Sequence, residues 1–90
     1  MALILVVDDS PVEQHVYSQV LKQRGYETIT ANDGEEAVSI ASDRKPDLII
    51  MDVVMPGMNG FQATRKLQKN PDTAGIPVII ISTKNQETDK

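Results

Sequence analysis

Three short runs of apolar residues, rich in branched side chains, constrain the fold of this chain more than any other feature. They lie at residues 3–7 (LILVV), 48–51 (LIIM) and 77–81 (PVIII). A continuous apolar run bounded by polar residues is typical of a strand that is covered on both faces, as in a parallel sheet. Residues 27–31 alternate weakly between polar and apolar and indicate a further strand near an edge.

Segments with helical spacing separate these runs. The first begins at Ser10, where Ser10-Pro11-Val12-Glu13 matches a capping box, and Gly25 is a reasonable C-terminal cap. Its apolar residues recur at helical spacing: Val12, Val16, Tyr17, Val20 and Leu21. A second helix opens at residues 32–36 and closes before Pro46. A third is predicted over residues 61–69, with Phe61, Thr64 and Leu67 facing inward.

The order of these segments is β-α-β-α-β-α-β, which predicts parallel strands joined by right-handed helical crossovers. The chain has 90 residues and neither an internal repeat nor a Pro/Gly/Ser-rich linker. We therefore expect residues 1–90 to form one small α/β domain.

Composition excludes several classes of function. The net charge is −4 and the basic residues are scattered among acids, which argues against nucleic acid as a direct ligand. No cysteine is present, so neither a disulfide framework nor a thiolate metal site is possible. The longest apolar runs are far too short for a membrane span, and the start of the chain lacks the basic residues of a signal peptide. We expect a cytoplasmic protein with no membrane insertion.

Carboxylates follow two of the apolar runs directly. Asp8 and Asp9 end the first run, Asp52 ends the second, and Ser82 follows the third. Each acid alone could be a helix cap or a loop residue. The carboxyl ends of parallel strands meet at one edge of a sheet, however, and three acids gathered there repel one another unless a cation lies between them.

An all-oxygen set of ligands points to a hard cation, and a small cluster that leaves room for water suits Mg²⁺ better than Ca²⁺. A carboxylate beside Mg²⁺ can act as a nucleophile toward a phosphoryl group. The sequence has no Walker loop, no G-x-G-x-x-G and no Ser/His/Cys nucleophile arrangement, which gives nucleotide hydrolysis and hydride transfer little support. The single histidine, His15, lies off the apolar stripe of its helix and is interpreted as an exposed residue.

The segments VVDDS, IIMDVVMPGMNG and PVIIIST together resemble the receiver domain of bacterial two-component response regulators over the whole chain. This resemblance implies a flavodoxin-like, doubly wound parallel sheet with strand order 2-1-3-4. The segments NGFQATRKL and STKNQETDK are, more narrowly, similar to stand-alone receivers of twitching-motility systems.

The resemblance also implies roles for individual residues. Asp52 is the phosphoacceptor, and Mg²⁺ is held by Asp8, Asp9, Asp52 and the backbone carbonyl of Val54. Ser82 is the switch hydroxyl. The loop beside the site is shaped by Met55, Pro56 and Gly60. Thr83 occupies a small-residue position next to the site. The implied partners are a histidine kinase, which donates the phosphoryl group, and a downstream signalling protein; the chain itself is not expected to be an enzyme.

The sequence departs from the family pattern after the third helix and fourth strand. A receiver usually continues through a further helix, a fifth strand that carries an essential lysine, and a closing helix, and Lys84 is not placed to replace that lysine. We therefore expect a C-terminally truncated receiver that is impaired in switching. We also expect it to form homo-oligomers, either through its exposed fourth strand or by exchange of elements.

Two other interpretations stay open from the residues. One is an interaction or dimerisation module in which the acids bind a cation but no phosphoryl group is transferred. The other, an aspartate-nucleophile phosphatase, is weaker because Val53 and Val54 follow Asp52 where such enzymes need a second acid.

Overall fold

Residues 2–81 are described in the computed structural model of the chain. The elements are β1 (Leu3–Val7), α1 (Pro11–Gln23), β2 (Glu27–Ala31), α2 (Gly34–Arg44), β3 (Leu48–Asp52), α3 (Gly60–Lys69) and β4 (Val78–Ile81). This is the predicted order. The boundaries differ slightly from those predicted, since β3 includes Asp52, α3 begins at Gly60 and β4 begins after Pro77.

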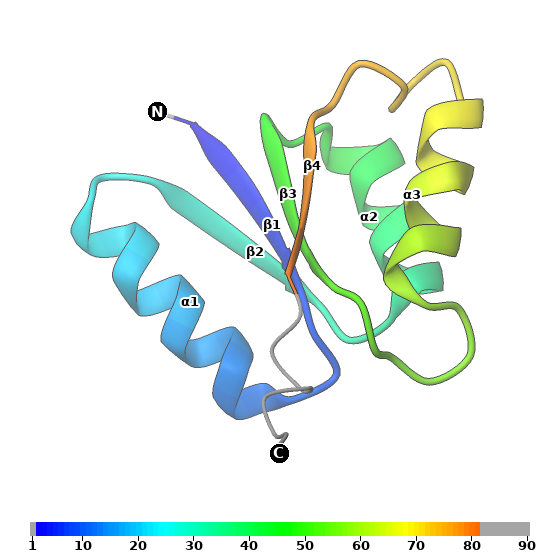
Figure 1. The fold of residues 1–90 in the computed structure, drawn as a ribbon. Helices are drawn as coiled ribbons and strands as arrows, with labels where there is room; N and C mark the ends of the chain where they lie inside the picture. The colour runs from blue at the N-terminus through cyan, green and yellow to red at the C-terminus, as the bar shows by residue number, and fades with distance from the viewer. Residues whose placement is uncertain (1, 82–90) are drawn as a thin grey trace.

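The four strands form one parallel sheet in the order β2-β1-β3-β4, which confirms the predicted fold class. Helix α1 lies on one face of the sheet, and α2 and α3 lie together on the other (Figure 1). The chain crosses from one face to the other between α1 and α2, so the sheet is doubly wound. The register pairs Val7 with Met51 and Asp52 with Ile81, which brings the ends of β1, β3 and β4 to the same edge.

The main core lies between the sheet and the pair α2–α3. Its buried members come from strands, helices and the loop after β3: Leu5, Val7, Ala31, Ala37, Ala41, Ile49, Met51, Met55, Ala63 and Leu67. The helices contribute mostly alanines, which allow them to approach the sheet closely, while the strands contribute the larger side chains. This face of the sheet therefore has the continuous packing that fixes the strand ends in place.

Helix α1 is present as predicted, but the valines of its apolar stripe are exposed, while Tyr17 and Leu21 are half-buried. The side chains of Val12, Val16 and Val20 are 69%, 49% and 49% exposed, and Ser18 is the one buried residue of α1. Helix α1 contacts β1 and β2, and its three valines lie outside the side that is packed on these strands. Helical spacing identifies an apolar stripe, but it does not show whether another element covers it.

The inward orientation predicted for Phe61 is wrong. Its side chain is 58% exposed, whereas Ala63 and Leu67 of α3 are buried. The buried positions of α3 are Gly60, Ala63 and Leu67, which recur at helical spacing and form one face, and Phe61 lies off that face. The prediction for Leu67 is confirmed.

The capping box predicted at the start of α1 is only half formed. The Ser10 hydroxyl accepts a hydrogen bond from the Glu13 N–H (3.4 Å), but the Ser10 N–H donates to Asp8 Oδ1 (2.9 Å) and not to Glu13. A reciprocal capping box occurs at α3 instead, between Asn59 and Gln62. The first helix cap therefore uses one of its backbone donors to hold a carboxylate of the strand end.

Within residues 2–81, no helix is both long enough and apolar enough to span a lipid bilayer.

Candidate functional site

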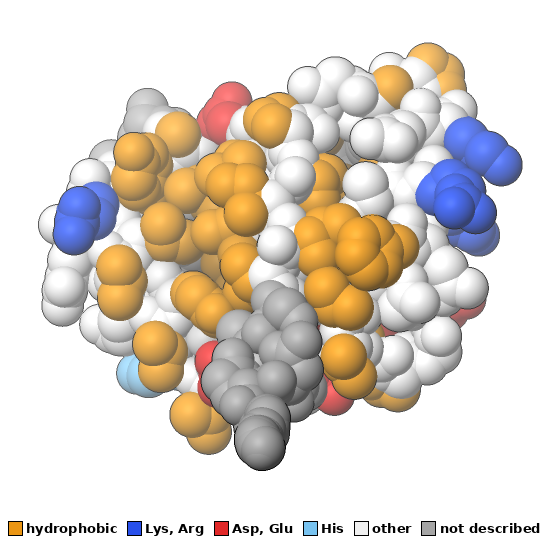
Figure 2. Space-filling view, viewed as in Figure 1, with side chains coloured by type: hydrophobic (Ala, Val, Ile, Leu, Met, Phe, Trp, Pro, Cys, Tyr) orange, Lys and Arg blue, Asp and Glu red, His pale blue; other side chains and the backbone are white. Residues whose placement is uncertain are grey.

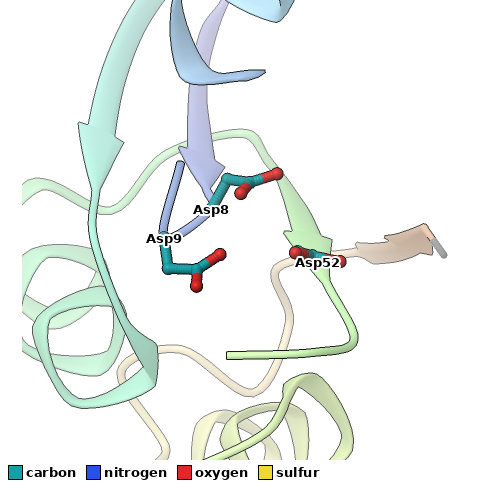
Figure 3. A group of neighbouring side chains, drawn as sticks. All are labelled: Asp8, Asp9 and Asp52. Atoms are coloured by element: carbon teal, nitrogen blue, oxygen red, sulfur yellow. The ribbon is translucent and has the colours of Figure 1, made fainter. Parts of the chain in front are cut away.

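Three carboxylates converge at the carboxyl edge of the sheet. Asp8 and Asp9 follow β1, Asp52 is the last residue of β3, and each offers an oxygen atom within 4.8 Å of the other two (Figure 3). The parallel register places the two strand ends side by side, because Val7 pairs with Met51. The predicted gathering of acids at one edge is therefore observed.

Backbone donors fix the first strand end. The Asp8 N–H donates to the carbonyl oxygen of Ala31 (3.1 Å) and so extends the pairing of β1 with β2 by one residue. Asp8 Oδ1 accepts the Ser10 N–H at 2.9 Å. The carboxylate of Asp8, which is 1% exposed, is thus oriented by the turn that leads into α1.

A close approach of the backbone fixes the second strand end. The Gly60 N–H donates to the Val53 carbonyl (2.9 Å), and a Cβ atom at Gly60 would lie 2.5 Å from the Asp52 carbonyl oxygen. Only glycine allows this approach without moving the strand end. Asp52 Oδ1 accepts the Val54 N–H at 3.4 Å, and the side chain of Asp52 is fully buried.

The negative charges of the cluster contribute to the pKa of a neighbouring tyrosine. The pKa of the Tyr17 phenol is raised above its ordinary value by burial and, to a smaller extent, by the negative charges of Glu13, Asp8 and Asp52. An anionic phenolate near these carboxylates is disfavoured by repulsion. The edge of the sheet is therefore a region of negative potential that favours a cation.

The residues fit a small, hard cation. All three ligand groups are carboxylates, two of them are buried and one is exposed, and their oxygens are close enough to share one ion. Carboxylate oxygens are the protein ligands that Mg²⁺ prefers, and an exposed side of the cluster leaves space for its retained waters. Within residues 2–81 this is the one group of three or more acids, histidines or cysteines with such spacing.

The other predicted site residues are only partly tested. Met55 is buried in the loop after β3, Gly60 packs on the Asp52 backbone, and Val54 and Pro56 are exposed beside them. The role of the Val54 carbonyl as a metal ligand stays a prediction. Ser82 and Thr83 lie outside the described residues.

One residue at this edge was given no role from the sequence. The side-chain amide of Gln14 donates to the Asp8 carbonyl oxygen (2.6 Å) and to Asn32 Oδ1 (2.8 Å), next to the metal-binding candidates. Glutamine is an ordinary residue on a helix, so only the fold reveals this contact.

Comparisons with known proteins agree with this geometry. The family model of the response regulator receiver domain matches residues 4–90. Protein PilH of Pseudomonas aeruginosa is 52% identical over 90 residues, which are all of this chain and 74% of PilH. Other curated relatives are longer proteins, and the chain spans 20% of one and 38% of another.

Solved structures give the same result. The N-terminal domain of a response regulator receiver protein from Methanoculleus marisnigri has a TM-score of 0.90 at 36% identity, over 97% of this chain and 71% of that one. The receiver domain of sensor histidine kinase PA1611 from Pseudomonas aeruginosa has a TM-score of 0.87 at 32% identity, over 98% of this chain and 72% of that one, and has a magnesium ion in its active-site cleft. The family match, the sheet order and the three carboxylates together show that this chain belongs to the response regulator receiver domain family.

Proposed function

We propose that the chain accepts a phosphoryl group on Asp52 from the phosphohistidine of a histidine kinase, with Mg²⁺ at the carboxylate cluster. The observation that carries this proposal is the meeting of the Asp8, Asp9 and Asp52 oxygens within 4.8 Å at the carboxyl edge of the sheet. Family membership and the magnesium ion in the PA1611 receiver support it. In this proposal the chain is a substrate in a signalling relay and not an enzyme that turns over an external compound.

The proposed chemistry follows from the position of Asp52. One carboxylate oxygen of Asp52 attacks the phosphorus of the donor, a P–O bond forms, and the P–N bond to the donor imidazole breaks. The imidazole nitrogen leaves with the electron pair of that bond. Asp8, Asp9, Asp52 and the Val54 carbonyl would hold Mg²⁺, which neutralises charge on the phosphoryl oxygens when it is bound. Ser82 is proposed as the hydroxyl that responds to the new phosphoryl group.

The fully buried side chain of Asp52 favours a specific acceptor over general phosphorylation of surface acids. Its neighbours Asp8 and Asp9 would repel a phosphoryl donor on their own, which explains why the proposed reaction needs a divalent cation. The acyl phosphate adds roughly 1.5 to 2 negative charges and new acceptor oxygens at this edge. We propose that a downstream signalling protein, of the twitching-motility type, reads the resulting change.

Labelling with a small phosphodonor tests this function directly. With Mg²⁺ and phosphoramidate, intact mass measurement should show one added phosphoryl group that hydroxylamine removes, and Asp52→Asn should abolish it. Asp43→Asn, at an exposed acid of α2 outside the cluster, is the matched control and should label like the wild type. Equal labelling of Asp52→Asn and Asp43→Asn would place the acceptor elsewhere.

Self-association is a second proposed property, and a specific observation favours it. Val78 packs into the core, so the neighbouring Ile79 points to the other face, where it is half exposed. Figure 2 shows apolar side chains spread across the middle of this view, with basic side chains near its margins. We propose that copies of this chain associate through the exposed face that carries Ile79 and through the edge strand β4, or by exchanging structural elements with one another. Light scattering over a range of concentrations tests this, and a monomer at all concentrations would refute it.

A further inference from the structure

The side chain of Gln14 makes an unusual set of contacts for a residue on the second turn of a helix. Its single amide nitrogen donates to the Asp8 carbonyl (2.6 Å), to Asn32 Oδ1 (2.8 Å) and, at a longer distance, to the Ala31 carbonyl (3.3 Å). An amide has two N–H donors, so the two short contacts use them and the third is shared. Gln14 therefore connects α1 with the ends of both β1 and β2.

The hydrogen bond from Gln14 to the Asp8 carbonyl takes the place of a backbone hydrogen bond that β2 would make if it were longer. The Glu27 N–H donates to the Ala2 carbonyl, and in a parallel pair such bonds recur at every second residue. This spacing would bring the Asp33 N–H to the Asp8 carbonyl if β2 continued. Strand β2 ends at Ala31, however, and Asp33 is the N-cap of α2. The Gln14 amide supplies the donor that the sheet no longer provides.

The Asp8 carbonyl belongs to the peptide group that joins Asp8 to Asp9. Holding this carbonyl fixes the plane of the peptide, and that plane contains the Asp9 nitrogen and Cα atoms from which the Asp9 side chain extends. Asp8 has further restraints from its own N–H and from Ser10. The Gln14 amide adds a restraint on the peptide that leads to Asp9, the exposed member of the cluster.

The other end of the contact is itself anchored. The Asn32 N–H donates to Glu36 Oε1 (2.7 Å), and the Glu36 N–H donates to the N-cap residue Asp33 (2.8 Å). Asn32 is therefore tied to the first turn of α2, and its Oδ1 is a stationary acceptor for Gln14. The amide is held by groups whose positions do not depend on a bound cation.

We propose that Gln14 is a positioning residue that preorganises the Asp8–Asp9 peptide for divalent cation binding. This inference rests on the proposed function, because it concerns the same site. Residues that orient metal ligands through hydrogen bonds commonly change metal affinity by 10- to 100-fold when they are replaced. Gln14 acts through a backbone group, and we expect an effect of about tenfold, the lower part of that range.

The main experiment compares Mg²⁺ affinity in two variants by isothermal titration calorimetry. Gln14→Met removes both donors with little change in side-chain length and no change in charge, and Gln19→Met makes the same replacement at an exposed position of α1. We expect about tenfold weaker Mg²⁺ binding for Gln14→Met and wild-type binding for Gln19→Met. Equal affinity of the two variants would overturn the proposal.

A spectroscopic measurement on the unmodified, metal-free chain makes the test independent of how Gln14→Met folds. The side-chain amide protons of Gln14 should exchange with water more slowly than those of Gln19, because only the former are hydrogen-bonded. Equal exchange would also overturn the proposal. A wild-type chain that binds no Mg²⁺ would refute the proposed function itself, and slow exchange at Gln14 would still show whether the amide holds the peptide.

Discussion

The two faces of the sheet are built differently. On the face covered by α2 and α3, the strands and helices form one continuous core in which Leu5, Ile49 and Leu67 are almost inaccessible. On the face covered by α1, the helix buries only Ser18 fully and leaves a row of three valines exposed. Figure 1 shows α1 standing apart from the other two helices, over one part of the sheet.

This difference shows that the two faces of the sheet contribute differently to the stability of the fold and to the geometry of the site. The α2–α3 face supplies most of the buried apolar contact, and it positions Asp52 through the backbone approach at Gly60. The α1 face contributes less burial but supplies hydrogen bonds to the other strand end, at Ser10 and Gln14. The α2–α3 face therefore holds the larger core, while the α1 face, to which the buried Ile4 and Val6 point, also orients carboxylates.

The largest expected effect tests this division by removing buried volume. Leu67→Ala on the α3 side should lower the free energy of unfolding by about 2–5 kcal/mol, because it deletes a fully buried side chain. Val16→Ala on the α1 side should change it by less than about 0.5 kcal/mol, because half of that side chain is already exposed. Urea unfolding of both variants measures the difference, and similar losses would mean that the valines are covered in solution.

A smaller effect is expected where α3 meets the site. Gly60→Ala places a methyl group against the Asp52 carbonyl and should destabilise the chain by about 1–3 kcal/mol. It should also weaken Mg²⁺ binding, since the end of β3 has to move. Gly75→Ala is the control, because a Cβ there meets no atom within 4 Å. If Gly60→Ala and Gly75→Ala change the free energy of unfolding and the Mg²⁺ affinity equally, the close approach of Gly60 to the Asp52 carbonyl is not important for either.

The smallest expected effect concerns the phenol of Tyr17, on the α1 side of the sheet. The raised pKa of Tyr17 means that the native state keeps its phenol proton to higher pH than the unfolded chain. Above the ordinary pKa of tyrosine, near pH 10, the free energy of unfolding should therefore fall as pH rises, and Tyr17→Phe should weaken this dependence.

The causes of this shift can be separated by titration. In a Tyr26→Phe background the remaining phenol is Tyr17, and its absorbance reports its pKa. Asp52→Asn removes one of the negative charges and should lower that pKa slightly, whereas Asp43→Asn should leave it unchanged. A Tyr17 pKa that is unchanged by Asp52→Asn would show that the charge of Asp52 does not contribute to the shift.

The strands and the acidic edge could be predicted from sequence because each depends on local pattern. A continuous run such as residues 48–51 requires burial on both faces, and an aspartate directly after it can only lie at the strand end. Parallel pairing then brings Asp8 and Asp52 together.

The exposures of Val16 and Phe61 and the contacts of Gln14 and Gly60 could not be predicted in this way. Periodicity identifies an apolar stripe but not the element that covers it. The contacts of Gln14 and Gly60 join segments that meet only after folding, so the sequence does not show which atoms these residues contact.

The unequal exposure of the three carboxylates has a consequence for the proposed phosphoryl transfer. Asp8 and Asp52 are buried, while Asp9 lies at the surface. Asp9 is therefore the carboxylate that a cation or a donor can meet from solvent without any rearrangement, whereas Asp52 has to become accessible before it can accept a phosphoryl group.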